Sequence, residues 1–208
     1  MKQLLSEINK LKKTSTKKVI DTRIKEFKEI KNKQNNKQLF QELCFCILAA
    51  NFNAERSLDL QNKIGNGFLT LTEKQLSNKL KQLGYRFPNI RAKYIVEARK
   101  HKQINRILNK YDDEEELRQY IVKNIKGLGL KEASHFLRNI GYDNFAIVDF
   151  HIVDILTKHN LIQRPKTMTP KSYIEIEDKL RTIAQKTQLN LAELDLYLWF
   201  QETGKVLK

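Results

Sequence analysis

The chain has 208 residues, and 40% of them are hydrophobic, which suffices for one globular domain or for two small ones that pack closely. Its 39 lysines and arginines against 24 aspartates and glutamates give a formal net charge of +15, far from the near-neutral balance of most enzymes that act on small molecules. This charge favours a polyanionic partner such as DNA. A lysine surplus also serves solubility or a thermophile's surface, so charge alone leaves the partner open.

Cellular context is predicted from what the sequence lacks. It has no apolar run of about eighteen residues, and its first residues show no apolar core followed by a cleavage site. We therefore expect no membrane segment and a cytoplasmic, intracellular protein. Its two cysteines, Cys44 and Cys46, alternate within an apolar run and are interpreted as buried, reduced thiols.

Seven glycines, three prolines and the lack of alternating β-branched stretches predict an all-α fold. Thr72 with Gln75 predicts a capping box, and Gly65 and Gly67 are expected to stop the preceding helix. Residues 164–170 are the clearest loop. In chain order, apolar spacing predicts helices over 4–11, 19–27, 41–50, 54–64, 73–83, 89–100, 112–125, from 130 onward, and over 150–158, 171–186 and 190–201.

Five consecutive acidic residues, 112–116, stand at the start of one predicted helix. The positive end of a helix dipole favours acids there. Neither a histidine nor a second carboxylate cluster follows at ligand spacing. We interpret these acids as a solvated helix start and expect no metal site.

Residues 125–133 read Ile-Lys-Gly-Leu-Gly-Leu-Lys-Glu-Ala. Gly127 and Gly129 allow a sharp turn between two helices, so that the second helix points its unpaired N–H groups at a phosphate. Lys131 lies in the first turn of that helix, where the positive field favours a neutral, nucleophilic amine. The Gly-x-Gly turn thus distinguishes Lys131 from an ordinary surface lysine.

Asp149 directly precedes the apolar stretch 150–156. It is placed to cap a helix and to face Lys131, and the two roles are compatible. A turn that grips phosphate, a lysine and a matched aspartate together predict a nucleic-acid enzyme with a lysine nucleophile.

These residues resemble the helix-hairpin-helix DNA glycosylase superfamily, most closely the archaeal-type 8-oxoguanine DNA glycosylase/lyases. Residues 48–56 are similar to the family segment that fills the hole left by an extruded base, with Asn51 and Arg56 at the matching positions. Residues 83–94 are similar to the segment that wedges into the opposite strand. The resemblance covers roughly residues 40–160. In a departure, Lys126 replaces the proline that usually opens the hairpin.

The resemblance implies a single glycosylase domain over 1–208, with two closely packed helical subdomains, the active site in the cleft between them, and the hairpin and catalytic segment at about 117–158. It implies a bifunctional glycosylase and abasic-site lyase that removes 8-oxoguanine from double-stranded DNA in base excision repair. Lys131 attacks the sugar, Asp149 stabilises the developing charge, and β-elimination through a lysine Schiff base cuts the strand. No cofactor is expected, because the chain lacks the cysteines of the iron–sulphur cluster that several relatives carry. We expect a nucleoid-associated monomer.

The resemblance also assigns residues to binding. The DNA-binding set is Gly127, Gly129, His151, Asn51, Arg56 and Tyr85. The base-recognition set is Trp199, Phe87 and Lys208. In the resembling family the helix that carries Trp199 helps to enclose the base, where an indole can stack on a purine. The C-terminal Lys208 folds back there, so that its carboxylate accepts the N7–H that distinguishes 8-oxoguanine from guanine.

Each of these assignments competes with an ordinary structural role. His151 is open to interpretation as a core histidine, Trp199 as part of a packed aromatic stripe, and Lys208 as a disordered chain end. Two other functions also stay open. One is a DNA-binding module that uses the hairpin only to hold phosphates, and the other is a glycosylase for a different damaged base.

Overall fold

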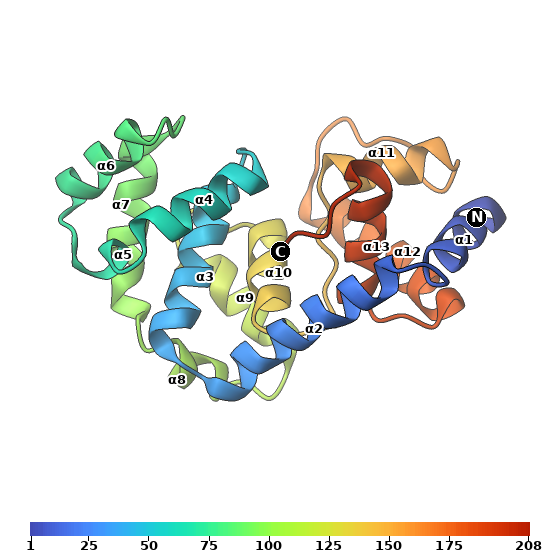
Figure 1. Cartoon of the computed structure of the whole chain (residues 1–208), viewed down its shortest axis with the longest axis horizontal. Helices are drawn as coiled ribbons and strands as arrows, with labels where there is room; N and C mark the ends of the chain where they lie inside the picture. Colours follow the sequence, from blue (N-terminus) through green and yellow to red (C-terminus); the bar gives the residue numbers. More distant parts are fainter. The chain divides into compact units, whose positions relative to one another are not determined.

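The computed structural model describes all 208 residues and is built from helices without strands, which confirms the all-α prediction (Figure 1). The chain divides into two compact units. We call residues 1–31 with 137–208 the terminal unit and residues 32–136 the middle unit. The helices are α1 (Lys2–Leu11), α2 (Thr16–Lys33), α3 (Asn36–Ala49), α4 (Ala54–Ile64), α5 (Gly67–Thr70), α6 (Glu73–Gln82), α7 (Pro88–Ala98), the 3-10 turn η1 (Arg99–His101), α8 (Ile104–Leu108), α9 (Glu114–Asn124), α10 (Leu130–Asn139), α11 (Phe150–Lys158), α12 (Pro170–Thr187) and α13 (Leu191–Thr203).

Helix α3 forms the core of the middle unit and packs against α4, α7 and α8. It begins five residues before the predicted start, at Asn36, because the Asn35 side chain caps it by accepting from two backbone N–H groups. Cys44 and Cys46 are fully buried free thiols, as predicted. Burial raises the pKa of the Cys44 thiol well above its ordinary value, which keeps the thiol protonated and unreactive.

Most helix boundaries in the middle unit follow the predicted signals. Thr72 and Gln75 form the predicted capping box. Gly65 ends α4 with a positive φ of 50°. Gly67, however, does not stop a helix but opens the short helix α5, where a Cβ would come within 2.9 Å of Leu71 Cδ1. The absence of a side chain at Gly67 therefore allows the Leu71 side chain to pack against the backbone. Helix α8 was not predicted.

In the terminal unit, α1, α11, α12 and α13 pack together. Helix α2 adds its buried apolar face, including Phe27, and lies against the turn that follows α10. At Gly141, with φ 95°, a Cβ would meet Phe27 O at 2.7 Å, so only glycine permits this approach. The N-terminal helices, which carried no sequence signature, therefore contribute to the packing of this unit. No helix in the structure has the length and hydropathy that crossing a bilayer requires.

Candidate catalytic and DNA-binding residues

The predicted hairpin is present in the middle unit between α9 and α10. Gly127 has a φ of 88°, and a Cβ there would lie 2.6 Å from the Tyr94 ring, so both conformation and packing require glycine. Gly129 differs. It has no positive φ, and a Cβ there would meet only Glu132 Oε2, at 3.4 Å. The turn thus depends on Gly127, whereas Gly129 offers an exposed backbone.

Helix α7 supports this hairpin where the family proline is missing. The Tyr94 ring packs on Gly127, and Lys126 Nζ lies 3.0 Å from Glu97 Oε2. The ion pair is largely exposed, so we assign it only about 0.2–1 kcal/mol. Packing by Tyr94 is therefore the main restraint on the turn.

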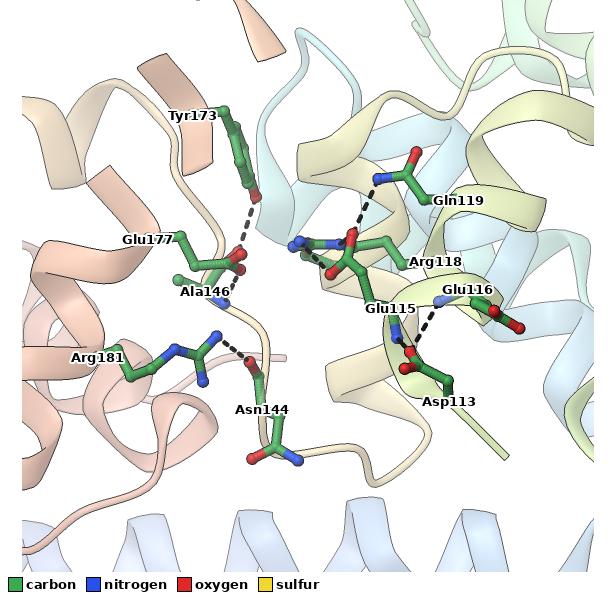
Figure 2. A network of polar contacts seen from close by, with 11 residues as sticks. Asp113, Glu115, Glu116, Arg118, Gln119, Asn144, Ala146, Tyr173, Glu177 and Arg181 are labelled. Carbon is green, nitrogen blue, oxygen red and sulfur yellow. Dashed lines mark hydrogen bonds and ion pairs between the residues drawn. The ribbon is translucent and has the colours of Figure 1, made fainter. Parts of the chain in front are cut away.

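A buried arginine joins α9 to α10. Arg118, 1% exposed, pairs with Glu115 Oε2 at 2.6 Å and donates to Ser134 Oγ at 3.1 Å. The Asp113 side chain caps α9 by accepting from the N–H groups of residues 115 and 116, which confirms the acidic cluster as a helix start. Figure 2 shows Glu115 between Arg118 and the amide of Gln119. Ser134 follows Lys131 by one turn, so this contact fixes the helix that carries the candidate nucleophile.

Lys131 is in the first turn of α10, as predicted, with its side chain 30% exposed. Its Nζ lies 3.0 Å from Oε1 of the neighbouring Glu132. The other oxygen of that carboxylate accepts from Gly129 N at 3.3 Å. Glu132 therefore contacts both the hairpin backbone and the candidate nucleophile, a role that the sequence did not predict.

Asp149, in the terminal unit, caps α11 as predicted. Its Oδ1 accepts from Ile152 N at 3.0 Å. The chain approaches it through residues 144–148, which form no helix. Side chains of α12 hold this segment.

Tyr173, Glu177 and Arg181 lie one turn apart on α12, and Figure 2 shows them reaching toward the segment. Arg181 donates to Asn144 O at 3.2 Å, and Glu177 Oε1 accepts from Ala146 N at 2.9 Å. Tyr173 Oη donates to Ala146 O at 2.7 Å and accepts from Val148 N at 3.3 Å. Four residues of a helix rise about 6 Å and two residues of an extended chain about 6.6 Å, so every fourth residue of α12 can bind every second residue of the segment. We call this series of hydrogen bonds the ladder, and it positions Asp149 at the start of α11.

Tyr173→Phe should therefore destabilise the protein. The hydroxyl is buried, and its loss leaves the two backbone groups that it binds without this partner, at a cost of about 1–3 kcal/mol. Urea unfolding followed by circular dichroism measures the loss. Tyr111→Phe is the control, because no hydrogen bond is described for that hydroxyl and its removal should leave the midpoint unchanged. Equal midpoints for both variants would contradict the ladder.

Three aromatic rings contact one another in series between the start of α11, next to Asp149, and α13. The Phe150 ring lies 3.9 Å from the His151 ring, whose other neighbour is Trp199, edge-on at 5.0 Å between centroids. His151 and Trp199 are only partly buried, so neither is an ordinary core residue. The Trp199 Nε1–H is buried and has no hydrogen-bond partner. Phe150 is 65% exposed, and sequence analysis did not single it out.

A largely buried carboxylate, that of Asp195, lies near Asp149. Asp195 Oδ2, on α13, is 3.2 Å from Arg138 Nη1, and both side chains are largely buried. Burial raises the pKa of Asp195 to about 6, Arg138 opposes the rise, and the charge of Asp149 adds to it. No sequence pattern predicts this pair, because only folding brings residues 138 and 195 together.

Two DNA-binding predictions concern the turn between α3 and α4. Asn51 is exposed in the left-handed conformation with φ 57°, and Arg56 Nη2 donates to Gly84 O at 2.9 Å. The Arg56 guanidinium also lies 5.0 Å from the Phe52 ring. Both side chains are thus presented at the surface of the middle unit, and the segments at 51–56 and 84 meet.

The Tyr85 side chain, which was predicted to contact DNA, is buried in the middle unit. Tyr85 is 4% exposed, its hydroxyl donates to Leu48 O at 2.7 Å, and its ring packs against Phe52. Burial raises the pKa of Tyr85, which keeps the hydroxyl protonated. The neighbouring Arg86 is exposed instead and stacks over Phe87 at 4.9 Å. Tyr85 supports the turn from inside.

The chain's last residues follow Gly204, which ends α13 in the left-handed conformation. Lys208 is partly buried. The last residue is therefore not fully exposed to solvent.

Comparison with known proteins agrees with these features. The family model described as 8-oxoguanine DNA glycosylase matches residues 20–189. The 8-oxoguanine DNA glycosylase/AP lyase of Methanocaldococcus jannaschii is 52% identical, covering 99% of each chain. The crystal structure of the M. jannaschii 8-oxoguanine glycosylase/lyase in complex with a 15mer DNA containing 8-oxoguanine matches with a TM-score of 0.96, covering 99% of this chain and 100% of that one at 51% identity. The 8-oxoguanine DNA glycosylase of Thermotoga maritima matches with a TM-score of 0.93 at 38% identity, covering 100% of this chain and 99% of that one. The chain belongs to the 8-oxoguanine DNA glycosylase family of helix-hairpin-helix proteins.

Proposed function

We propose that this protein excises 8-oxoguanine from double-stranded DNA and then cleaves the strand at the abasic site. The observation that carries the proposal is Lys131 in the first turn of α10, directly after the Gly127 turn, in a chain that resembles glycosylase/AP lyases along its whole length. The enzyme works as a monomer in the cytoplasm, associated with the nucleoid.

The proposed chemistry uses protein groups alone. The Lys131 amine attacks C1′, the bond from C1′ to N9 breaks, and the base leaves with the proton that the attacking amine gives up. The Asp149 carboxylate stabilises the positive charge that develops on the sugar. The sugar ring opens to a Schiff base on Lys131. Loss of a C2′ proton expels the 3′ phosphate, and hydrolysis of the imine releases the lysine.

The hairpin and the α3–α4 turn bind the DNA in this proposal. Backbone N–H groups at the start of α10 donate hydrogen bonds to a phosphate, and His151 approaches a second phosphate. Asn51 and Arg56 fill the space that the extruded base leaves in the duplex. Their exposed position supports this role. Arg86, the exposed neighbour of the buried Tyr85, contacts the opposite strand from the segment at residues 83–94.

Base recognition falls to Trp199, Phe87 and Lys208. An indole that stacks on a purine contributes about 1–3 kcal/mol. The unpaired Nε1–H of Trp199 is in addition a donor that a bound base can use. The carboxylate of Lys208 accepts the N7–H of 8-oxoguanine, a donor that guanine lacks.

Deleting Lys208 should reduce excision of 8-oxoguanine by about tenfold to a hundredfold, because the buried N7–H loses its acceptor at a cost of about 1–3 kcal/mol. Single-turnover release of the base measures this effect. Cleavage at a preformed abasic site is the control, since it requires Lys131 but no base recognition, and it should be unchanged. Equal excision by both proteins would remove Lys208 from the base site.

A panel of duplexes, each with one defined lesion, tests the proposed function as a whole. The proposal predicts base release and strand cleavage with 8-oxoguanine, and no release from a duplex of normal bases. A DNA-binding module would bind all the duplexes and release nothing. Release of only an oxidised pyrimidine or a mismatched adenine would identify a glycosylase for another lesion. Either result would overturn the proposal.

A further inference from the structure

Glu132 contacts two groups of the middle unit, the hairpin backbone and the Lys131 amine. In the proposed function the first binds a DNA phosphate and the second attacks the sugar. One carboxylate oxygen lies 3.0 Å from Lys131 Nζ, and the other accepts from Gly129 N at 3.3 Å. The Glu132 side chain is only 15% exposed, less than the 30% of Lys131. The carboxylate is therefore held between the hairpin backbone and the amine, rather than extended into solvent as surface glutamates usually are.

The Gly129 N–H is one of the unpaired donors that a helix N-terminus presents to an anion. In the DNA-free protein the anion at this donor is the carboxylate of Glu132. A DNA phosphate that docks on the hairpin needs the same donor. The two anions repel each other and cannot share one N–H group. Phosphate binding at this turn therefore has to displace Glu132.

The same carboxylate opposes the chemistry of Lys131. The Lys131 amine lies against the Glu132 carboxylate, and it has to leave this partner before it can reach C1′ of a bound nucleotide. The other ionisable groups nearby on α9 and α10 have different partners. Arg118 is directed to Glu115 and Ser134, and His135 stacks edge-on against Phe45. Within the middle unit, Glu132 is thus the charged side chain that contacts Lys131.

We propose that Glu132 is a positioning residue that occupies the phosphate position at Gly129 and holds Lys131 until DNA displaces it. Docking of the DNA backbone moves the carboxylate away from the turn, and the amine loses the partner that held it in place. The nucleophile is thereby released only when a duplex is seated on the hairpin. This inference rests on the proposed function for the identity of the nucleophile, but the competition at Gly129 does not depend on it.

The test compares Glu132→Gln and Glu132→Ala with Glu97→Gln. Glu97 is a matched control, because its carboxylate pairs with a hairpin lysine at the same distance of 3.0 Å and its neutralisation changes the net charge equally. Two quantities are measured. One is the affinity for a lesion-free duplex over a range of salt concentrations, and the other is the rate of borohydride trapping on a preformed abasic site.

We expect both Glu132 variants to bind lesion-free duplex about threefold to tenfold more tightly than the Glu97 variant does at low salt, because no internal anion has to leave. We also expect both Glu132 variants to be trapped faster than the wild type, because the amine no longer has to leave a carboxylate, whereas the trapping rate of the Glu97 variant should match the wild type. A residue that only stabilised the turn would weaken both binding and trapping when replaced, so a gain is diagnostic. Circular dichroism checks that each variant is folded.

Two results would overturn the inference. In one, the Glu132 variants match the Glu97 variant in both affinity and trapping rate. In the other, they bind more weakly or are trapped more slowly than the wild type. Absence of trapping by the wild-type protein would instead contradict the proposed function, and the affinity comparison would still decide whether Glu132 competes with phosphate.

Discussion

Lys131→Gln should abolish both base release and strand cleavage while leaving binding to lesion-bearing duplex largely intact. Glutamine keeps much of the side-chain length but has no amine, so neither attack at C1′ nor a Schiff base is possible. We expect both rates to fall at least about a thousandfold, as for other enzymes that lose their nucleophile. Single-turnover assays on an 8-oxoguanine duplex, with gel-shift affinity in parallel, measure the two effects.

Lys126→Gln is the matched control for this variant. Lys126 belongs to the same hairpin, and its amine is paired with Glu97 rather than with a group in the first turn of α10. The control removes the same positive charge, so it should weaken DNA binding modestly and leave cleavage of bound substrate near the wild-type rate. Cleavage by the Lys131 variant at the wild-type rate would contradict the mechanism, whatever the rate of the Lys126 variant.

Asp149→Asn should slow base release by about a hundredfold to a thousandfold, the usual cost of removing one electrostatic stabiliser of a transition state. The amide carries no charge to oppose the positive sugar. It remains a good helix cap, because asparagine and aspartate are nearly equivalent at that position. The melting temperature should therefore change little, and single-turnover kinetics together with thermal melting separate the two roles.

Asp113→Asn is the corresponding control for Asp149→Asn. Asp113 caps α9 with the same kind of contact, accepting from the N–H groups two and three residues later at 2.7 and 3.0 Å. Its replacement should shift melting by a similar small amount and leave the chemistry unchanged. If Asp149→Asn proved as active as the wild type, or lost activity only in proportion to unfolded protein, Asp149 would be a cap alone.

The features that sequence predicted well are local. The caps at Thr72 and Asp149 and the turn at Gly127 depend on residues within a few positions of each other, so the sequence contains all the partners. The fold class followed from apolar spacing for the same reason.

The features that it missed depend on distant residues or on the direction of a side chain. The ladder from Tyr173 to Ala146 and the pairing of Arg138 with Asp195 join segments that only folding brings together. Tyr85 was assigned to DNA because the resemblance identifies a segment, whereas burial against Phe52 decides where its side chain points. The exposure of Phe150 is likewise a result of packing.

Borohydride trapping followed by mass spectrometry tests the central claim most directly. The wild-type protein is mixed with an 8-oxoguanine duplex and, separately, with the same duplex containing guanine, and the attached residue is located in the reduced adduct. We predict a covalent adduct with the lesion duplex only, attached at Nζ of Lys131. An adduct on any other amine, or no adduct with the lesion duplex, would contradict the assignment of Lys131 as the nucleophile.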